Sequence, residues 1–176
     1  MLWLAEQGWQ ATGQDFSTRA IERARTEAAA RGLAPTESGA EGVAGTDAAA
    51  ARGSARFEAR DLETWEPEPG GVDLVTASFF HSEVALQRVE ILRRAAGALA
   101  PGGHLVVLSH AAPPPWASGH HDHAARMLSA AEEAAQLDLD PGRFTVVVAE
   151  QRERPANAPD GRTGMLEDSL LVLRRR

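Results

Sequence analysis

The sequence predicts an α/β fold, a doubly wound and mostly parallel sheet that ends in an antiparallel hairpin. Segments with strand and helix patterns alternate along most of the chain. Residues 72–80 are apolar on both faces, which is typical of a strand inside a parallel sheet rather than at its edge. The last two expected strands, 144–149 and 168–173, are joined by a loop rich in Gly, Pro and Asn, which predicts a hairpin connection.

The composition is that of a globular domain: 176 residues, 43% of them hydrophobic and 24% charged. No run of eighteen apolar residues occurs, and no basic region precedes the first amphipathic segment, so we expect a cytoplasmic protein with no membrane partner. Cysteine and lysine are both absent, which excludes disulfides, thiolate chemistry and Schiff-base catalysis. A net charge of -7 argues against nucleic acid as a partner.

The first third of the chain predicts a helix, a strand and a second helix. A short helix stops at Gly8, and residues 9–15 form a strand that ends in an acidic residue. The hydroxyl at Ser17 or Thr18 caps the next helix, and Gly32 ends it. Residues 33–54 are rich in Ala, Gly, Ser and Thr, which predicts a flexible insertion.

Regular structure is expected again after this insertion. Residues 56–61 form a strand, and residues 83–100 form the clearest helix of the sequence. Pro101-Gly102-Gly103 ends that helix before a strand at 104–109. A last helix uses apolar positions from Ala124 to Leu137.

Ligands of doubly wound sheets bind beyond the carboxyl ends of the strands, so the residues at those ends are the candidates. They are Asp15, Asp61, residues 78–81 and Ser109-His110. A carboxylate after the second strand can accept hydrogen bonds from both ribose hydroxyls. Asp15 also suits a cap or dipole partner of the following helix, and Asp61 also suits a turn.

The order of several short motifs resembles the class I S-adenosylmethionine-dependent methyltransferases, which have a Rossmann-like sheet, and within them the small bacterial tellurite-resistance-type group. The resembling segments are Trp3-Leu4-Ala5-Glu6-Gln7-Gly8-Trp9, Thr12-Gly13-Gln14-Asp15-Phe16-Ser17, Ala20-Ile21-Glu22-Arg23-Ala24, Ala59-Arg60-Asp61-Leu62, Val72-Asp73-Leu74-Val75 and Leu99-Ala100-Pro101-Gly102-Gly103. The resemblance covers nearly the whole chain apart from residues 33–54.

The resemblance implies a set of residues that bind S-adenosylmethionine. Asp15 would hold the ribose hydroxyls, Phe16 and Leu62 would enclose the adenine, and Asp61 would accept from its amino group. Ser78 would face the methionine part of the cofactor and the reacting methyl group.

One part of the family pattern is missing from this chain. The family begins with a strand and a glycine-rich loop that approaches the methionine end of the cofactor, and no such segment occurs among residues 1–176. The missing first strand would lie between the strands that carry Asp15 and Ser78. We therefore expect a single N-terminally truncated methyltransferase-like domain or, alternatively, a protein that has lost a principal cofactor contact. The strand edges that lack a partner also allow pairing with a second copy of the chain, as a homodimer.

Histidines and tryptophans supply further candidates. His81 and His110 follow strands at the ligand-binding edge, where each suits an acceptor pocket, a base or a structural role, and we assign His81 as the catalytic candidate. The spacing of His120, His121, Asp122 and His123 fits no zinc signature, so we expect no metal. Trp65 and Trp116 suit either an apolar acceptor or a cover for the sheet.

The leading hypothesis is methyl transfer from S-adenosylmethionine to a small-molecule acceptor. Tellurite, thiols, amines and hydroxyls all remain open as acceptors. A non-catalytic nucleotide-binding or scaffold protein on the same fold is the alternative from another class. A nicotinamide-dependent oxidoreductase is a third hypothesis, because Asp15 suits either ribose.

Overall fold

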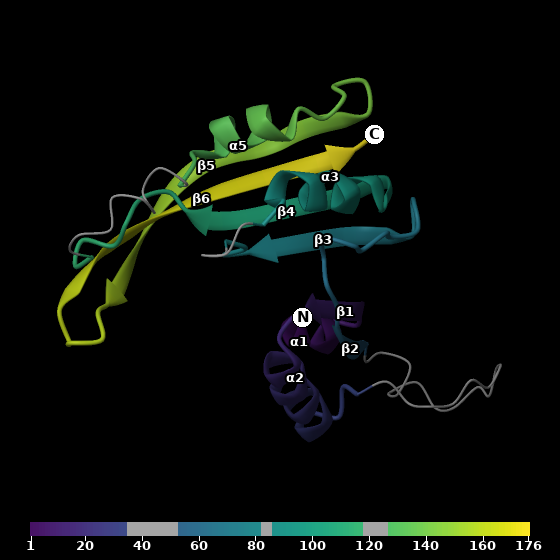
Figure 1. Ribbon diagram of the computed structural model, residues 1–176, viewed down its shortest axis with the longest axis horizontal. Coiled ribbons are helices and arrows are strands. Elements are labelled where there is room, and N and C mark those ends of the chain that lie inside the picture. The colour runs from purple at the N-terminus through teal and green to yellow at the C-terminus, as the bar shows by residue number, and fades with distance from the viewer. Residues whose placement is uncertain (35–52, 82–85, 118–126) are drawn as a thin grey trace. The chain divides into compact units, whose positions relative to one another are not determined.

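The computed structural model describes residues 1–34, 53–81, 86–117 and 127–176 (Figure 1). These residues gather into two units, Met1–Trp65 and Glu66–Arg176, and each is described by itself. The cluster of His120, His121, Asp122 and His123 lies outside the described residues.

The first unit contains two parallel strands and two helices. Its elements are α1 (Leu2–Glu6), β1 (Gln10–Asp15), α2 (Thr18–Ala30) and β2 (Ser54–Ala59). The strands pair in register from Gln10 opposite Ser54 to Asp15 opposite Ala59. Side chains from α1, α2 and β2 and the residue Leu33 form the core, which consists of Ala5, Ile21, Ala28, Leu33, Ala55 and Phe57.

The start of α2 follows from its local sequence. The Ser17 hydroxyl accepts a hydrogen bond from the backbone N–H of Ala20 at 3.2 Å, as expected of an N-terminal cap. Ile21 and Ala28, seven residues apart and therefore on one helix face, are both buried. The chain leaves the helix through Gly32, whose φ is +66°, a conformation that glycine adopts without strain. The cap and end predicted for this helix are confirmed.

The second unit contains a four-stranded sheet with helices on one face. The elements are β3 (Val72–Ser78), α3 (Arg88–Gly97), β4 (Leu99–His110), α5 (Ala130–Leu137), β5 (Phe144–Asn157) and β6 (Thr163–Arg175). The strand order is β3-β4-β6-β5, parallel between β3 and β4 and antiparallel elsewhere. Helices α3 and α5 pack against each other and over the sheet. The predicted mixed α/β fold and the final antiparallel hairpin are confirmed.

The core of this unit lies between the helices and the sheet. From Gly103 onward every second residue of β4 is buried, and Leu105 and Val107 pack in the core with residues of α3 and α5. The opposite face of β4 carries His104, Val106, Leu108 and His110, which are only half-buried. The alternation sets His110 on the sheet face away from the helices.

The expectation that residues 72–80 lie inside a sheet is wrong for the described part of the chain. β3 pairs with β4 alone and forms an edge, and its residues are half-buried or exposed. Its apolar sequence suits neighbours on both sides, but the described residues contain no strand that pairs with its other side.

The predicted boundary between residues 83–100 and the next strand is also wrong. Helix α3 begins only at Arg88, while residues 83–85 lie outside the described part. It ends at Gly97, because Leu99 already pairs with Val72 of β3. Pro101-Gly102-Gly103 therefore lies inside β4, where Gly102 has φ +86° and the register shifts.

The last predicted helix begins later than expected. Met127 and Leu128 are not helical, and α5 begins after Ser129. The Ser129 hydroxyl accepts from the Glu132 backbone N–H, and the Glu132 carboxylate accepts from the Ser129 backbone N–H. This reciprocal pair is a capping box, and it fixes the start of the helix.

Both ends of the predicted insertion belong to the fold. Leu33 is 2% exposed, and its carbonyl accepts from the Ala55 N–H at 2.7 Å. Ser54 is the first residue of β2. Residues 35–52 lie outside the described part, so their flexibility stays a prediction.

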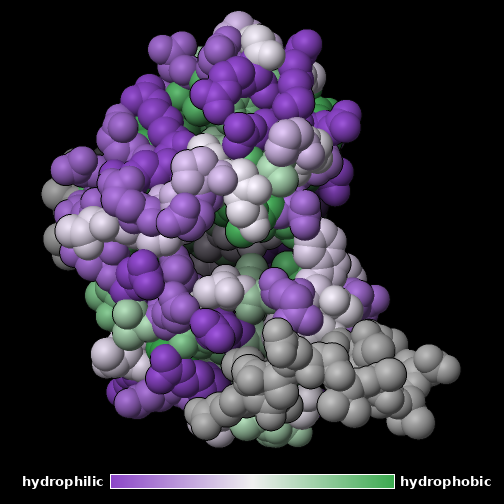
Figure 2. Space-filling model, turned by 90° about the vertical axis from the view of Figure 1, so that its right-hand side faces the viewer, coloured by the Kyte–Doolittle hydropathy of each residue, from purple (hydrophilic) through white to green (hydrophobic). Residues whose placement is uncertain are grey.

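One face of the molecule is mostly hydrophilic. Figure 2 shows hydrophilic side chains over most of the displayed face, with small hydrophobic areas between them. Among the helices of the described residues, none is long and apolar enough to cross a membrane.

Candidate functional site

The carboxyl ends of β1 and β2 lie side by side in the first unit. Asp15 is the last residue of β1 and pairs with Ala59, the last residue of β2. The backbone N–H of Arg60 donates to the Asp15 carbonyl at 2.9 Å and extends the pairing by one residue. The turns that begin at Asp15 and at Asp61 therefore leave the sheet at one edge, as the sequence predicted.

Asp15 uses one carboxylate oxygen to shape its own loop. Its Oδ1 accepts from the Ser17 backbone N–H at 2.8 Å, which orders the residues leading to α2. The N-terminal cap of α2 is Ser17, so Asp15 orders the loop before the cap and is not itself the cap. Its Oδ2 has no hydrogen bond within the described residues, and the side chain is half-buried. One oxygen remains for a ligand.

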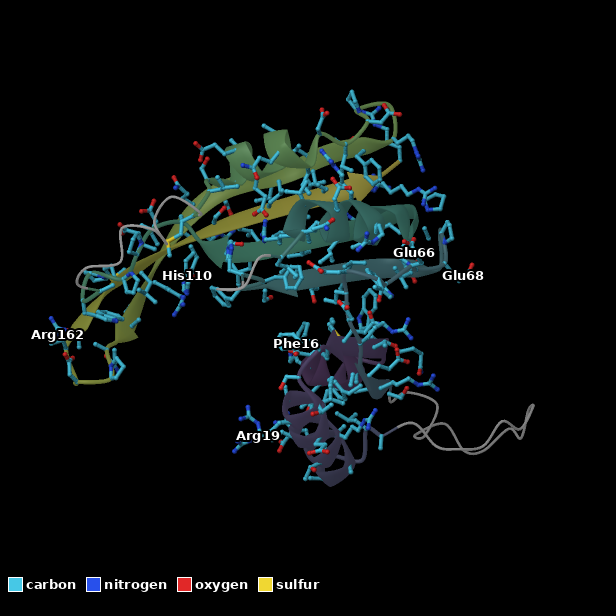
Figure 3. All side chains as sticks on the ribbon, in the orientation of Figure 1. Phe16, Arg19, Glu66, Glu68, His110 and Arg162 are labelled. Atoms are coloured by element: carbon cyan, nitrogen blue, oxygen red, sulfur yellow. The ribbon has the colours of Figure 1, made fainter. Side chains whose placement is uncertain are left out.

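Phe16 follows Asp15 and is 81% exposed (Figure 3). Burying a phenyl ring of this kind contributes about 1.5–3 kcal/mol, so leaving it in water gives up that stabilisation. An exposed ring next to a carboxylate forms an apolar surface beside a hydrogen-bond acceptor. This combination suits a ligand with a flat apolar part and a polar part.

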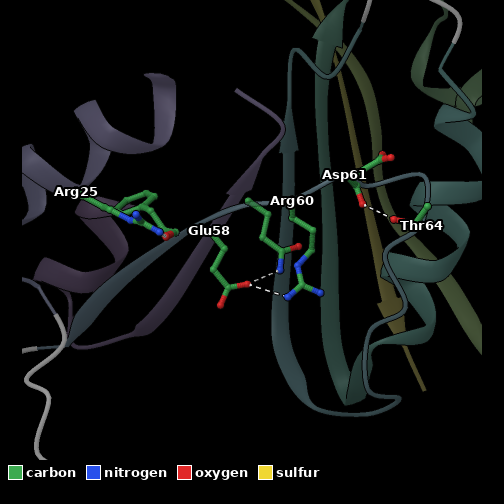
Figure 4. Close-up of polar contacts among 7 residues, drawn as sticks. Arg25, Glu58, Arg60, Asp61 and Thr64 are labelled. Atoms are coloured by element: carbon green, nitrogen blue, oxygen red, sulfur yellow. Dashed lines mark hydrogen bonds and ion pairs between the residues drawn. The ribbon is translucent and has the colours of Figure 1, made fainter. Parts of the chain in front are cut away.

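Asp61 repeats the arrangement after β2. Its Oδ1 accepts from the Glu63 backbone N–H at 2.9 Å, and its carbonyl accepts from the Thr64 hydroxyl at 3.3 Å (Figure 4). Asp61 is exposed, and the neighbouring Leu62 is half-buried. The carboxylate can accept further hydrogen bonds, since an ionised carboxylate has about four acceptor sites.

The nearest cation at this edge is already paired. Arg60 lies 3.4 Å from the Glu58 carboxylate, which also accepts from the Gln14 side chain at 3.2 Å (Figure 4). Arg25 donates to the carbonyl of Phe57. Within the described residues neither Asp15 nor Asp61 has an ion pair. Both carboxylates are therefore suited to neutral donors such as hydroxyl and amino groups.

Ser78 and His81 belong to the second unit. Ser78 is the last residue of β3 and is exposed. The backbone N–H of His81 donates to the Phe79 carbonyl at 2.9 Å, and its ring has no hydrogen bond within the described residues. The pKa of His81 lies below its ordinary value, because partial burial disfavours the charged ring and the positive charges of Arg88 and His110 add to this effect.

Two residues that the sequence did not single out, Asp168 and Arg154, lie together with Phe79 around His110 at the end of β4. His110 Nδ1 lies 2.9 Å from Oδ1 of Asp168, and Nε of Arg154 donates to Oδ2 of Asp168 at 2.5 Å. The ring of Phe79 lies 4.6 Å from the His110 ring, measured between centroids. The pairing of β4 with β6 places Asp168 opposite His110, and this pairing is the signal that a strand-by-strand prediction lacks.

Trp116, a predicted acceptor contact or sheet cover, packs on β6. A Cβ atom added at Gly164 would lie 3.1 Å from its ring. The small residue at Gly164 thus admits the indole, and covering the sheet is the role that the structure supports for Trp116. Trp65 lies at the end of the first unit and is half-buried.

The first unit has one further surface feature, a shallow hollow beside its helices. The hollow, of about 340 Å³, lies between α1 and α2, and its lining includes none of the predicted site residues. No group of three or more His, Asp or Glu side chains that suits a metal ion occurs in the described ranges.

Comparison with known families identifies the family of this chain. The profile of the family described as a methyltransferase domain matches residues 1–107. The chain belongs to this family. The match covers both carboxyl-end aspartates and all of β3. The expected class, an S-adenosylmethionine-dependent methyltransferase, and its cofactor are thereby confirmed.

Solved structures agree on the fold of this methyltransferase. An S-adenosylmethionine-dependent methyltransferase from Methanosarcina mazei is 17% identical, with a TM-score of 0.62, over 98% of this chain and 85% of that one. The N-methyltransferase NodS from Bradyrhizobium japonicum, solved with S-adenosylhomocysteine, is 18% identical, with a TM-score of 0.54, over 93% of this chain and 65% of that one. TehB from Haemophilus influenzae is 11% identical, with a TM-score of 0.57, over 100% of this chain and 53% of that one.

Proposed function

We propose that this methyltransferase transfers a methyl group from S-adenosylmethionine to a small-molecule acceptor, and that the β1–β2 edge binds the nucleoside part of the cofactor. The observation that carries the proposal is the parallel register of β1 and β2. It brings the Asp15 and Asp61 turns to one edge, next to the exposed ring of Phe16.

Asp15 is the proposed ligand of the ribose hydroxyls. Its Oδ1 is held by the Ser17 N–H, so the carboxylate has a fixed orientation before any ligand binds. Its Oδ2, together with the remaining acceptor site on Oδ1, can accept from two vicinal hydroxyls. The residue therefore fits the role that the resemblance implies.

Phe16, Leu62 and Asp61 are the proposed ligands of the adenine. The Phe16 ring is exposed and offers a flat apolar surface, and Leu62 offers an aliphatic one. The Asp61 carboxylate accepts from the Glu63 backbone N–H, and an ionised carboxylate retains acceptor capacity for an exocyclic amino group. The Asp61 carboxylate, like that of Asp15, is oriented by a contact with the backbone N–H two residues ahead.

Ser78 and His81 are the proposed residues on the side of the reacting methyl group. S-adenosylmethionine, when bound, supplies an electrophilic methyl on a sulfonium, and the reaction is an in-line displacement. The protein accelerates such a step mainly by aligning the acceptor and excluding water. His81 is suited to contact a neutral acceptor, because its lowered pKa keeps the ring uncharged at neutral pH.

Isothermal titration calorimetry with S-adenosylhomocysteine tests the proposal on Asp15. We expect Asp15→Ala to weaken binding by about 1–3 kcal/mol, which is about 5- to 150-fold in Kd. Asp160→Ala is the matched control, since Asp160 Oδ1 likewise accepts from a backbone N–H two residues ahead, but in the β5–β6 loop. Equal weakening by both substitutions, or no binding by the wild-type chain, contradicts the proposal.

A further inference from the structure

We propose that His110, held by Asp168, is the general base of this methyltransferase and that the acceptor is a hydroxylated aromatic ring. This inference rests on the proposed function, because it assigns the acceptor of that reaction. It is carried by four side chains from the end of the second sheet: Phe79, His110, Arg154 and Asp168. Figure 3 shows His110 at the end of β4.

The contact with Asp168 fixes the tautomer of His110. An ionised carboxylate only accepts hydrogen bonds, so Nδ1 at 2.9 Å from Oδ1 must carry the proton. The neutral ring then has its lone pair on Nε2. The His110 side chain is 34% exposed, whereas that of Asp168 is 7% exposed. The ring therefore contacts a buried anion through Nδ1, and its exposed part is accessible to an acceptor.

Arg154 holds the other oxygen of Asp168. Its Nε donates to Oδ2 at 2.5 Å, so both carboxylate oxygens are engaged and the carboxylate cannot rotate without breaking a contact. The guanidinium also supplies the counter-charge that a buried carboxylate needs. A carboxylate that orients an imidazole through Nδ1 is the arrangement by which hydrolases use histidine as a base. Asp168 and Arg154 are positioning residues in this scheme.

Phe79 indicates the chemical class of the acceptor that binds beside His110. Its backbone has φ +53°, in the left-handed region that a non-glycine residue adopts at an energetic cost. In this conformation the ring packs on His110 and lies 5.9 Å from the Arg154 guanidinium, while the residue stays 41% exposed. An exposed aromatic ring next to the base is suited to pack against an aromatic acceptor.

The presence of a base favours a hydroxyl acceptor over the other classes. An amine attacks with its free lone pair and can lose its proton afterwards, and a thiolate needs no base during the attack. A hydroxyl group becomes a good nucleophile only as its proton leaves. The proton passes to Nε2 of His110, the O–C bond forms as the S–C bond breaks, and the electron pair of that bond stays on sulfur. Water then takes the proton from the imidazolium.

His81 lacks the features that make His110 a base. Its ring has no carboxylate partner within the described residues, so nothing there selects a tautomer. The charged groups around His110 are Asp168 on β6, Arg154 on β5 and His81 after β3, and Arg88 acts on His81. Of these groups, Asp168 is the anion in direct contact with the His110 ring.

The first test measures the tautomer by ¹⁵N NMR of the imidazole rings in the full chain. We expect neutral His110 to carry its proton on Nδ1, because Asp168 accepts from that atom, and we expect Asp168→Asn to abolish this preference. His104→Gln is the control, because His104 lies on the same face of β4, six residues and about 20 Å earlier. A proton on Nε2 of His110 in the wild type, or an unchanged tautomer preference in Asp168→Asn, overturns the proposal.

The second test measures methyl transfer to catechol, thiophenol and benzylamine. We expect methylation of catechol, and a loss of about 10²- to 10⁴-fold in kcat for His110→Gln with unchanged S-adenosylhomocysteine affinity. Asp168→Asn should also lower kcat, whereas His104→Gln should leave kcat unchanged.

The outcomes separate this inference from the proposed function. Wild-type protein that binds S-adenosylhomocysteine but methylates only thiophenol or benzylamine, or none of the three compounds, overturns the inference alone. Full catechol turnover by His110→Gln does the same. Failure of the wild type to bind S-adenosylhomocysteine overturns the proposed function and this inference together.

Discussion

Arg88 at the start of α3 and Glu133 in α5 form an ion pair in which the Glu133 side chain is 2% exposed and that of Arg88 13%. Arg88 also donates to the Phe80 carbonyl at 2.8 Å and to the Ser109 hydroxyl at 3.2 Å. One guanidinium therefore connects both helices to the ends of β3 and β4. The residues that we assign to the acceptor side lie at the same strand ends.

Replacing one partner of this ion pair should destabilise the second unit. We expect Glu133→Ala to lower the free energy of unfolding by about 3–5 kcal/mol, because it leaves a largely buried guanidinium without its counter-charge. Glu90→Ala is the control, since the Glu90–Arg93 pair is exposed and should contribute less than about 1 kcal/mol. Urea unfolding measures both. Equal losses in the two variants would contradict the structural role of the Arg88–Glu133 pair.

Two glycine substitutions should differ in sign. A Cβ atom at Gly53 would lie 2.0 Å from the carbonyl oxygen of Trp9, so Gly53→Ala should destabilise the first unit by about 2–4 kcal/mol. Gly97 is the last residue of α3 and has no atom within 4 Å of such a Cβ, so Gly97→Ala should stabilise the protein by about 0.5–1 kcal/mol. Thermal and urea unfolding of both variants check this, and a neutral Gly53→Ala would show that the close approach to Trp9 is not maintained.

The lowered pKa of His81 predicts loss of stability in mild acid. The folded protein disfavours the protonated ring, so this contribution is present above the ordinary pKa of histidine and is lost as the pH falls through the folded value. We expect His81→Gln to lose less stability than the wild type between about pH 7.5 and pH 5.5. Urea unfolding at both pH values measures the difference, and identical pH dependence of the two proteins is the contrary result.

Local sequence signals predicted the elements of the first unit well. Ser17 and Gly32 bound α2 through contacts within a few residues, and such contacts are readable from the chain. The end of α3 was not predictable in this way. Leu99 leaves the helix because it pairs with Val72, twenty-seven residues earlier, and the Pro-Gly-Gly signal that follows it is a bulge.

The candidate site shows the same division. Asp15 and Asp61 were predicted because each lies at the carboxyl end of its own expected strand. Asp168 and Arg154 were missed because they meet His110 only through the pairing of β4, β6 and β5, and the sequence alone does not give that pairing or its register. Phe79 was included in the edge segment, but its left-handed backbone and its contact with His110 are visible only in the structure.

The most direct measurement of the central claim, that the β1–β2 edge binds the cofactor, is a ¹H–¹⁵N NMR titration with S-adenosylhomocysteine. The Ser17 and Glu63 amides report on the two aspartates, because each donates to one of their carboxylates. We expect saturable shifts at these two amides and at Phe16, with no shift at Arg162, whose amide contacts Asp160 in the β5–β6 loop. Saturable binding that leaves the Ser17 and Glu63 amides unshifted would contradict the account.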